Sequence, residues 1–137
     1  DKMAFTGNFT ADSFKTALLN GDVDFSTDIF KIALYTNSAS LNETTSIYTT
    51  DGEVVAAGYT AGGETLSATV SALDGVSFVS FANVSWTSAL TARGALIYKE
   101  GGTAVCVLDF GSDKTSTTTF TVEFPPATNT TAILRLN

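Results

Sequence analysis

The clearest pattern in the sequence is a pair of apolar runs separated by a short polar turn. Within residues 92–110, the segment 99–102 divides the two runs, and this arrangement predicts a β-hairpin. Neither run alternates between apolar and polar residues, since residues 96–98 and 105–108 are consecutive apolar side chains. Both faces of the hairpin therefore require shielding from water. One packed sheet shields one face, and we expect either another element of the chain or a neighbouring subunit to shield the second.

Strand patterns recur along the rest of the chain. Residues 29–36 form another run that is apolar on both sides, and residues 117–124 alternate as in a half-exposed strand. Asp74-Gly75 predicts the turn of a second hairpin. The other expected elements are strands at 65–73, 76–81, 84–86 and 131–136, a polar turn at 111–114 and a long loop-rich excursion at 37–63. Short strands separated by turns predict an all-β fold, a β-sandwich or jelly-roll-like arrangement.

The N-terminal region has a different pattern. Residues 1–9 contain isolated apolar side chains around a Gly-Asn pair and predict an extended arm, with a frayed terminus as the alternative. Residues 10–20 place apolar side chains on one helical face, with Thr10 as the expected N-cap. We therefore expect an arm at 1–9, followed by a single domain at 10–137 that begins with one short helix. That helix is the best candidate within the chain to cover a sheet face.

Composition narrows the classes of partner. Of 137 residues, only 15% are charged, against about 25% in ordinary soluble domains. The formal net charge is −7 and the basic residues are scattered singly, which opposes binding to a phosphate backbone or an anionic membrane surface. No apolar run approaches the length of a membrane span. We expect neither nucleic acid nor membrane as a partner.

The residue types of common catalytic sites are scarce. The sequence has no histidine, the general base of Ser-His-Asp and Cys-His sites and the commonest metal ligand. The single cysteine, Cys106, lies in an apolar run and is expected to be a buried thiol. Asp109 and Glu123 lie on predicted strands and formally suit a glycosidase pair, but the residues around them lack the aromatic and polar density of a sugar cleft. We expect no enzymatic activity, no cofactor and no metal site.

Two further patterns admit both a binding and a structural interpretation. Asp22, Asp24 and Asp28 are spaced as at the start of a calcium loop, but the sixth and twelfth positions hold Thr27 and Ala33 instead of Gly and Glu. A solvated acidic turn is therefore favoured. Aromatic side chains in an all-β chain usually belong to a core or an interface, although they can form a sugar-stacking platform. The candidates are Trp86, Tyr48, Tyr59 and Tyr98.

Arg93 is the one cation inside the apolar strands of the central hairpin. A buried or interfacial arginine needs a carboxylate partner. A turn at residues 100–103 places Arg93 opposite Phe110, one position from Asp109. We predict a structural contact between Arg93 and Asp109, made either diagonally or through a β-bulge.

Three phrases carry a family resemblance: FKIALYTNSASL at 30–41, AAGYTAGGETL at 56–66 and TARGALIYKEGGTAVCVLDFGSDKTS at 91–116. The sequence from residue 25 onward resembles a widespread group of tailed-bacteriophage virion proteins, whose members are often described only as structural proteins. The resemblance implies a non-enzymatic component of the virion, assembled in the cytoplasm of the bacterial host. It implies the phage major capsid protein or other virion proteins as partners.

The resemblance and the surplus of apolar strand surface together predict a capsid decoration or cement protein. Such a protein would bind the major capsid shell as a homo-oligomer and stabilise it. The expected protein-interface anchors are Phe5, Phe9, Phe14 and Leu18. The alternative is a head fibre, collar or tail component that contacts the host surface through its loops.

Overall fold

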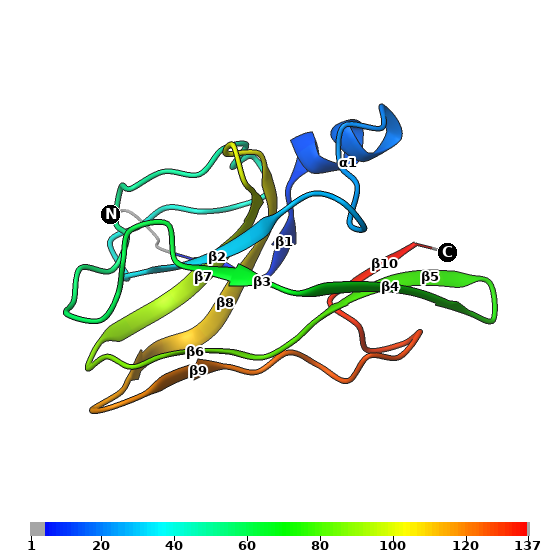
Figure 1. The fold of residues 1–137 in the computed structure, drawn as a ribbon. Coiled ribbons are helices and arrows are strands. Elements are labelled where there is room, and N and C mark those ends of the chain that lie inside the picture. Colours follow the sequence, from blue (N-terminus) through cyan, green and yellow to red (C-terminus); the bar gives the residue numbers. More distant parts are fainter. Residues whose placement is uncertain (1–4, 137) are drawn as a thin grey trace.

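The computed structural model describes residues 5–136, which form a mostly-β chain with one short N-terminal helix (Figure 1). Every pair of neighbouring strands in its sheets is antiparallel. The expectation of a β-rich fold with a short helix near the N-terminus is confirmed. The elements are β1 (Phe9–Thr10), α1 (Asp12–Leu19), β2 (Phe30–Tyr35), β3 (Glu64–Leu66), β4 (Ala68–Leu73), β5 (Val76–Phe81), β6 (Val84–Trp86), β7 (Thr91–Lys99), β8 (Ala104–Thr115), β9 (Phe120–Val122) and β10 (Leu134–Leu136).

The strands form three groups. A five-stranded sheet has the order β1-β8-β7-β2-β3, a three-stranded sheet has the order β10-β5-β4, and β6 pairs with β9. Both predicted hairpins are present, as β7–β8 and β4–β5. The second hairpin turns at Asp74 and Gly75, whose φ angles of 54° and 80° suit a type I′ turn.

One face of the five-stranded sheet packs against aromatic side chains from later and earlier parts of the chain. Register places Phe30 and Ile32 of β2 on the same face as Ile97 of β7. Phe25 stacks on Phe30 with ring centroids 4.6 Å apart, and its ring also lies 6.4 Å from that of Phe81. In Figure 1 the paired strands β6 and β9 run beneath β7 and β8 on the lower side of the molecule.

The opposite face is covered by the segment between β2 and β3. Tyr98 lies on this face, and Tyr48 from the segment stacks on it at 4.7 Å. The same segment bonds to the edge of β2, where the Val54 N–H donates to the Leu34 carbonyl at 2.9 Å. As a result, the side chains of residues 32–35 and 95–97 are fully buried within the chain itself.

This packing corrects the expectation that the central strands leave surplus apolar surface for a partner. The second cover is neither a neighbouring subunit nor the short helix alone. It is the segment 36–63, of which residues 37–63 were predicted only as a loose excursion. Several of its apolar side chains, such as Leu41 and Val54, are buried, whereas Ile47 and Val55 are exposed. A segment with little regular structure can thus still complete a core.

Several boundaries differ from the sequence-based prediction. Residues 111–114 were expected to form a turn, but β8 continues through them because Lys114 and Thr115 pair with the start of β7. The helix begins after Ala11, which makes no side-chain cap, because Thr10 is engaged in β1 opposite Cys106. The strands expected at 117–124 and 131–136 are shorter, as β9 and β10.

The predicted arm is described only from residue 5, and its residues 1–4 lie outside the described part of the chain. Phe5 is buried in the core. Phe9 in β1 pairs with Val107 of β8, and the Asn8 side chain accepts a 2.6 Å hydrogen bond from the Asp109 N–H. Residues 5–10 are thus integrated into the edge of the five-stranded sheet.

Candidate functional site: an apolar groove beside the helix

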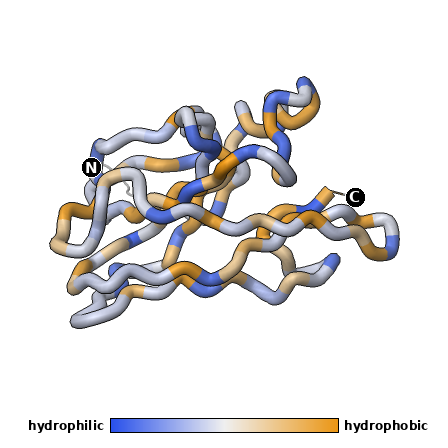
Figure 2. Tube along the Cα trace, in the orientation of Figure 1, coloured by the Kyte–Doolittle hydropathy of each residue, from blue (hydrophilic) through white to orange (hydrophobic). Residues whose placement is uncertain are grey.

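A groove of about 820 Å³ lies between α1 and the three-stranded sheet β10-β5-β4. In Figure 1 this sheet extends to the right of the molecule with α1 above it. Figure 2 shows hydrophobic positions in the helix and in the strands across from it. The residues that line the groove are Thr10, Phe14, Lys15, Leu18, Leu19, Phe25, Val70, Ser77, Phe78, Val79, Ile133, Leu134, Arg135 and Leu136.

The floor of the groove is an apolar sheet face that starts in the core and ends in solvent. Val79 of β5 is paired with Val70 on one side and Leu134 on the other, so the three side chains share a face. Val79 and Leu134 are buried, whereas Val70 is 54% exposed and Leu136 is 61% exposed. The groove is therefore an open continuation of the hydrophobic core toward the hairpin tip.

The helix supplies the opposite wall. Phe14 and Leu18 are spaced i, i+4 and lie on the same side of α1, with Phe14 buried and Leu18 half-buried. Leu19, the next residue, is 88% exposed. A large apolar side chain held this far into solvent at the mouth of an apolar groove is typical of an interaction surface.

The charge of the groove differs from that of the whole chain. Among the described residues that line it, Lys15 and Arg135 are basic and none is acidic, on a chain of net charge −7. Arg135 pairs with Phe78, so its side chain points to the face of the sheet opposite the Val79 and Leu134 side chains. The Lys15 ammonium lies 3.9 Å from the Asp12 carboxylate, and both side chains are 63% exposed. Such an exposed ion pair contributes little free energy, so Lys15 remains available to another anion.

The four predicted interface anchors have different environments. Phe5 and Phe14 are buried in the chain's own core, each 4% exposed. Phe9 and Leu18 are half-buried and pack against that core. The structure brings Phe14 and Leu18 together in the groove wall, and it places Phe5 and Phe9 at the β8 edge, next to the predicted Arg93 contact.

The Arg93–Asp109 contact is present and depends on a β-bulge. The pairing of β7 with β8 shifts register between Ala92–Lys114 and Gly94–Asp109, so that residues 110–113 of β8 bulge opposite the single residue Arg93 of β7. Its guanidinium donates to the Asp109 carboxylate, with the two side chains 18% and 14% exposed, and lies 5.7 Å from the Phe5 ring centroid. The pair thus joins the β8 edge to residue 5 and has a structural role.

Replacing Arg93 with alanine is expected to destabilise the fold by about 2 kcal/mol, because it leaves a mostly buried carboxylate with fewer partners. The thermal midpoint should fall by roughly 6–8 °C, as measured by circular dichroism. Lys31→Ala is the matched control, since the ion pair of Lys31 with Glu100 spans 3.8 Å and is more exposed. Equal midpoints for the two variants would contradict the structural role of Arg93.

A second cluster centres on a buried carboxylate that the sequence analysis did not single out. Glu53 accepts hydrogen bonds from the hydroxyls of Tyr48 and Tyr59 at 2.5 Å each, and from the Gly62 N–H at 2.8 Å. Tyr59 also accepts a 2.9 Å hydrogen bond from the Leu34 N–H. The cluster satisfies its polar groups internally and fastens residues 36–63 to β2.

The four tyrosines of the chain share this environment, and the pKa of each phenol group is raised. Burial and the nearby Glu53 carboxylate raise the pKa of Tyr98 to about 12. The same two causes, burial first, raise the pKa of Tyr35, Tyr48 and Tyr59 above the ordinary phenol value of 10.0. The folded chain therefore keeps phenolic protons that the unfolded chain releases.

Because the folded chain keeps these phenolic protons, we expect its stability to fall steeply at alkaline pH. Below about pH 10 both states are protonated and the stabilisation is complete. Above it the unfolded state binds fewer protons than the folded state, so stability falls as pH rises toward about 12, by up to about 1.4 kcal/mol per pH unit for each such phenol. Circular dichroism and tyrosinate absorbance should change together in one transition. Tyrosine ionisation near pH 10 in a chain that stays folded would contradict this.

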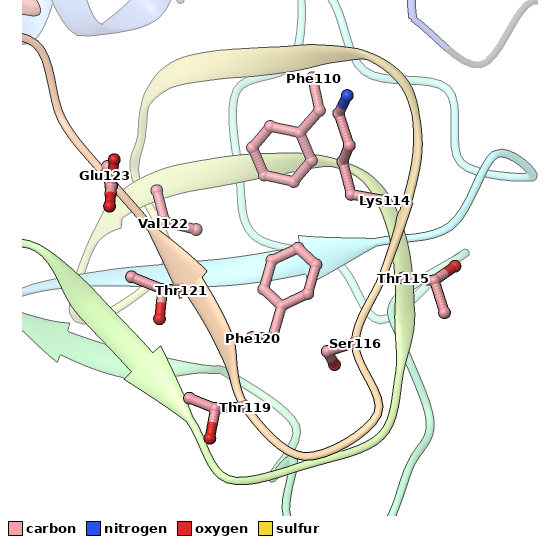
Figure 3. Close-up of a pocket in the computed structure, with 9 residues that line it drawn as sticks. All are labelled: Phe110, Lys114, Thr115, Ser116, Thr119, Phe120, Thr121, Val122 and Glu123. Atoms are coloured by element: carbon pink, nitrogen blue, oxygen red, sulfur yellow. The ribbon is translucent and has the colours of Figure 1, made fainter.

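A smaller pocket of about 410 Å³ lies between the end of β8 and β9 (Figure 3). The rings of Phe110 and Phe120 lie 6.1 Å apart in it, and hydroxyl-bearing side chains occupy much of its rim. Trp86, a candidate for a sugar platform, is 2% exposed and packs 6.3 Å from Phe120. These aromatic residues are accounted for by core packing.

The cysteine and the acidic turn that the sequence analysis considered lie in environments that indicate structural roles. Cys106 is buried, and burial raises the pKa of its thiol to about 12. Asp24 accepts hydrogen bonds from the Ser26 N–H and hydroxyl, which lower its pKa, and Asp28 pairs with Lys99 at 3.3 Å. Within residues 5–136 no three acidic, cysteine or histidine side chains are grouped to hold a metal ion, and no helix has the length and apolarity of a membrane span.

Comparisons of the chain with models of protein families, with curated proteins and with solved structures found no match.

Proposed function

We propose that this chain is a non-enzymatic structural protein of a tailed-phage virion, and specifically a capsid decoration or cement protein. The observation that carries the proposal is the open apolar groove between α1 and the β10-β5-β4 sheet, flanked by the exposed side chains of Leu19, Val70 and Leu136. It supplies an adhesive surface on a chain that otherwise buries its core internally. The sequence resemblance to tailed-phage virion proteins indicates that this surface adheres to a virion.

In this proposal the two layers of strands form a β-sandwich that serves as a rigid support for the groove. Apolar surface buried against a shell protein contributes roughly 25 cal/mol per Å². Repetition over a symmetric lattice adds avidity, so a modest contact suffices at each position, particularly if the chain binds as a homo-oligomer. The acidic net charge keeps the unbound chain soluble.

The experiment is to measure how many copies of the chain each purified virion contains, by quantitative mass spectrometry against the major capsid protein. On the order of hundreds of copies supports decoration of the lattice. A few to a few dozen copies would place the chain in a head fibre, collar or tail instead. Absence from purified virions would overturn the proposal.

A further inference from the structure

The β10-β5-β4 sheet ends in an edge strand that lacks the usual protection against pairing with another chain. Among the described strands β4 pairs only with β5, and its residues 69–73 are exposed. Its six residues include no charge and no proline, and its pairing with β5 has no register shift. Charge, proline, bulges and short length are what normally keep a sheet edge single. The β4–β5 hairpin also extends to the right of the molecule in Figure 1, away from the five-stranded sheet.

The other sheet edges in the described part of the chain carry such protection. Strands β1, β3, β6, β9 and β10 are two or three residues long, and β3 and β10 include the charged residues Glu64 and Arg135. The last part of β8 bulges at residues 110–113 and carries Asp113 and Lys114. The long, uncharged edge of β4 is therefore a distinct feature of this fold.

The backbone groups that β4 offers follow from its register with β5. The Ala82 N–H donates to the Ser67 carbonyl at 3.1 Å, and hydrogen-bonded pairs recur at every second residue along an antiparallel ladder. The odd-numbered residues of β4 therefore direct their N–H and C=O groups toward β5, and the even-numbered residues direct theirs away from the sheet. The outward-directed residues are Ala68, Val70 and Ala72. No backbone hydrogen bond from residues 5–136 reaches them.

These outward groups are symmetric about Val70, which suits a second copy of the chain. If two β4 strands pair antiparallel across a two-fold axis at Val70, the two Val70 residues lie opposite each other, and Ala68 of each copy lies opposite Ala72 of the other. Such pairs exchange about six backbone hydrogen bonds in total. On the other face Thr69 lies opposite Ser71, a pairing that suits hydrogen bonds between hydroxyls.

The absence of charge also favours a copy of this chain over a foreign strand. Like charges directly opposite each other destabilise a strand pair, and self-pairing of β4 brings none together. Charges along an edge select one foreign partner over another, and β4 has none for that purpose. Each copy has a net charge of −7, but the resulting general repulsion is screened over about 8 Å at physiological ionic strength.

We propose that two copies of this chain associate through β4, so that their two three-stranded sheets form one continuous sheet with the order β10-β5-β4-β4-β5-β10. Val70, which is 54% exposed in one copy, is covered by its equivalent in the other. This contact supplies the homo-oligomer that the proposed function expects, but it is a property of the isolated chain and does not rest on that function.

Sedimentation velocity of the purified full chain, over a series of concentrations at physiological salt, tests the contact. The wild type should form a dimer that dissociates on dilution. Val70→Pro removes an outward N–H without affecting the ladder to β5, and Val70→Lys places like charges opposite each other. Each should weaken the dimer at least about tenfold, with circular dichroism confirming that the variant folds. Val55→Lys, at a side chain that is 98% exposed elsewhere, should leave the dimer unchanged. A wild type that is monomeric throughout, or equal affinities of the variants at residues 70 and 55, would overturn the proposal.

A cysteine at residue 70 tests the register. Opposed residues of a hydrogen-bonded antiparallel pair have Cα atoms about 5.5 Å apart, within the range that a disulfide bridges. Val70→Cys should therefore form a covalent dimer under mild oxidation, and Val55→Cys should not. The native Cys106 is buried, so the unmodified chain should form no such dimer. A Val70→Cys chain that sediments as a dimer without cross-linking would contradict the β4 contact.

Leu136→Asp distinguishes this contact from one made through the groove beside α1. Leu136 lines that groove and is 61% exposed, but it lies on β10, at the edge of the sheet opposite β4. Its replacement should leave the dimer intact. A monomeric Leu136→Asp variant would assign the dimer to the groove and overturn the proposal. None of these measurements uses virions, so failure of this inference is distinguishable from failure of the proposed function, which the virion copy number tests.

Discussion

Replacing Glu53 with alanine is expected to destabilise the chain by about 3–5 kcal/mol. The substitution removes the acceptor for three donors, the hydroxyls of Tyr48 and Tyr59 and the Gly62 N–H. Each buried donor left without a partner costs about 1–3 kcal/mol. Because these bonds fasten residues 36–63 over the central sheet, their loss also exposes apolar surface of β2 and β7. Urea denaturation measures the change.

Two variants separate this network from a general effect of losing charge. Glu53→Gln keeps one acceptor oxygen but turns an amide group toward donors, so we expect an intermediate loss of about 2 kcal/mol. Glu43→Ala removes an exposed carboxylate from the same segment and should change stability by less than about 0.5 kcal/mol. If Glu53→Ala were as stable as Glu43→Ala, the buried Glu53 carboxylate would not be what holds residues 36–63 in place.

Gly63→Ala is expected to destabilise the chain by more than about 4 kcal/mol or to prevent folding. A Cβ atom at this position would lie 1.8 Å from the Ile32 carbonyl oxygen, and the φ angle of +79° is one that L side chains rarely adopt. The clash involves the backbone of a fully buried strand, which cannot move aside without disturbing the core. The change is measured by urea denaturation, or by soluble yield if the variant does not fold.

Gly75→Ala provides a matched control for the backbone strain. Gly75 has a φ angle of +80°, but a Cβ atom there would meet nothing within 4 Å. Its cost should therefore be that of the conformation alone, about 1 kcal/mol. Similar losses for the two variants would mean that residue 63 does not approach β2 as closely as described.

The hairpins were predictable from sequence because their signals are local. Asp74-Gly75 marks a two-residue turn, and the polar break at residues 99–102 separates two apolar runs, so the pairing of each hairpin follows from the position of its turn. The β7–β8 register next to the turn did not, because the pairing shifts between Ile97 and Tyr98. The Arg93–Asp109 contact also followed, since the predicted register left the two residues one position apart; the length of the β8 bulge at residues 110–113 opposite Arg93 was not predicted.

The cover of the central sheet was not predictable, because it depends on contacts between distant residues. Residues 36–63 carry scattered apolar side chains with no helical or strand period. They are held by backbone hydrogen bonds to neighbouring strands and by the buried Glu53 carboxylate. In the sequence, Glu53 resembles any acidic residue on the surface. The one local indication that it is buried is its position between Tyr48 and Tyr59 and before the glycines at 62–63.

The groove was predicted only in part. The face of Phe14 and Leu18 was identified as apolar, but half of it is used by the chain's own core. The exposed side chains lie elsewhere, at Leu19, Val70 and Leu136. The sequence did not distinguish Leu18, which packs against the core, from Leu19, which is exposed, because adjacent positions of a helix can belong to one apolar face.

In the proposed function, the groove beside α1 is the surface that attaches the chain to a virion. The direct measurement is the copy number of the chain in purified virions of phage that carry Leu19→Asp or Val55→Asp, with circular dichroism confirming that both variants fold. We predict that Leu19→Asp reduces incorporation by about tenfold or more, and that Val55→Asp is incorporated like the wild type. Equal incorporation of the two variants would contradict the account.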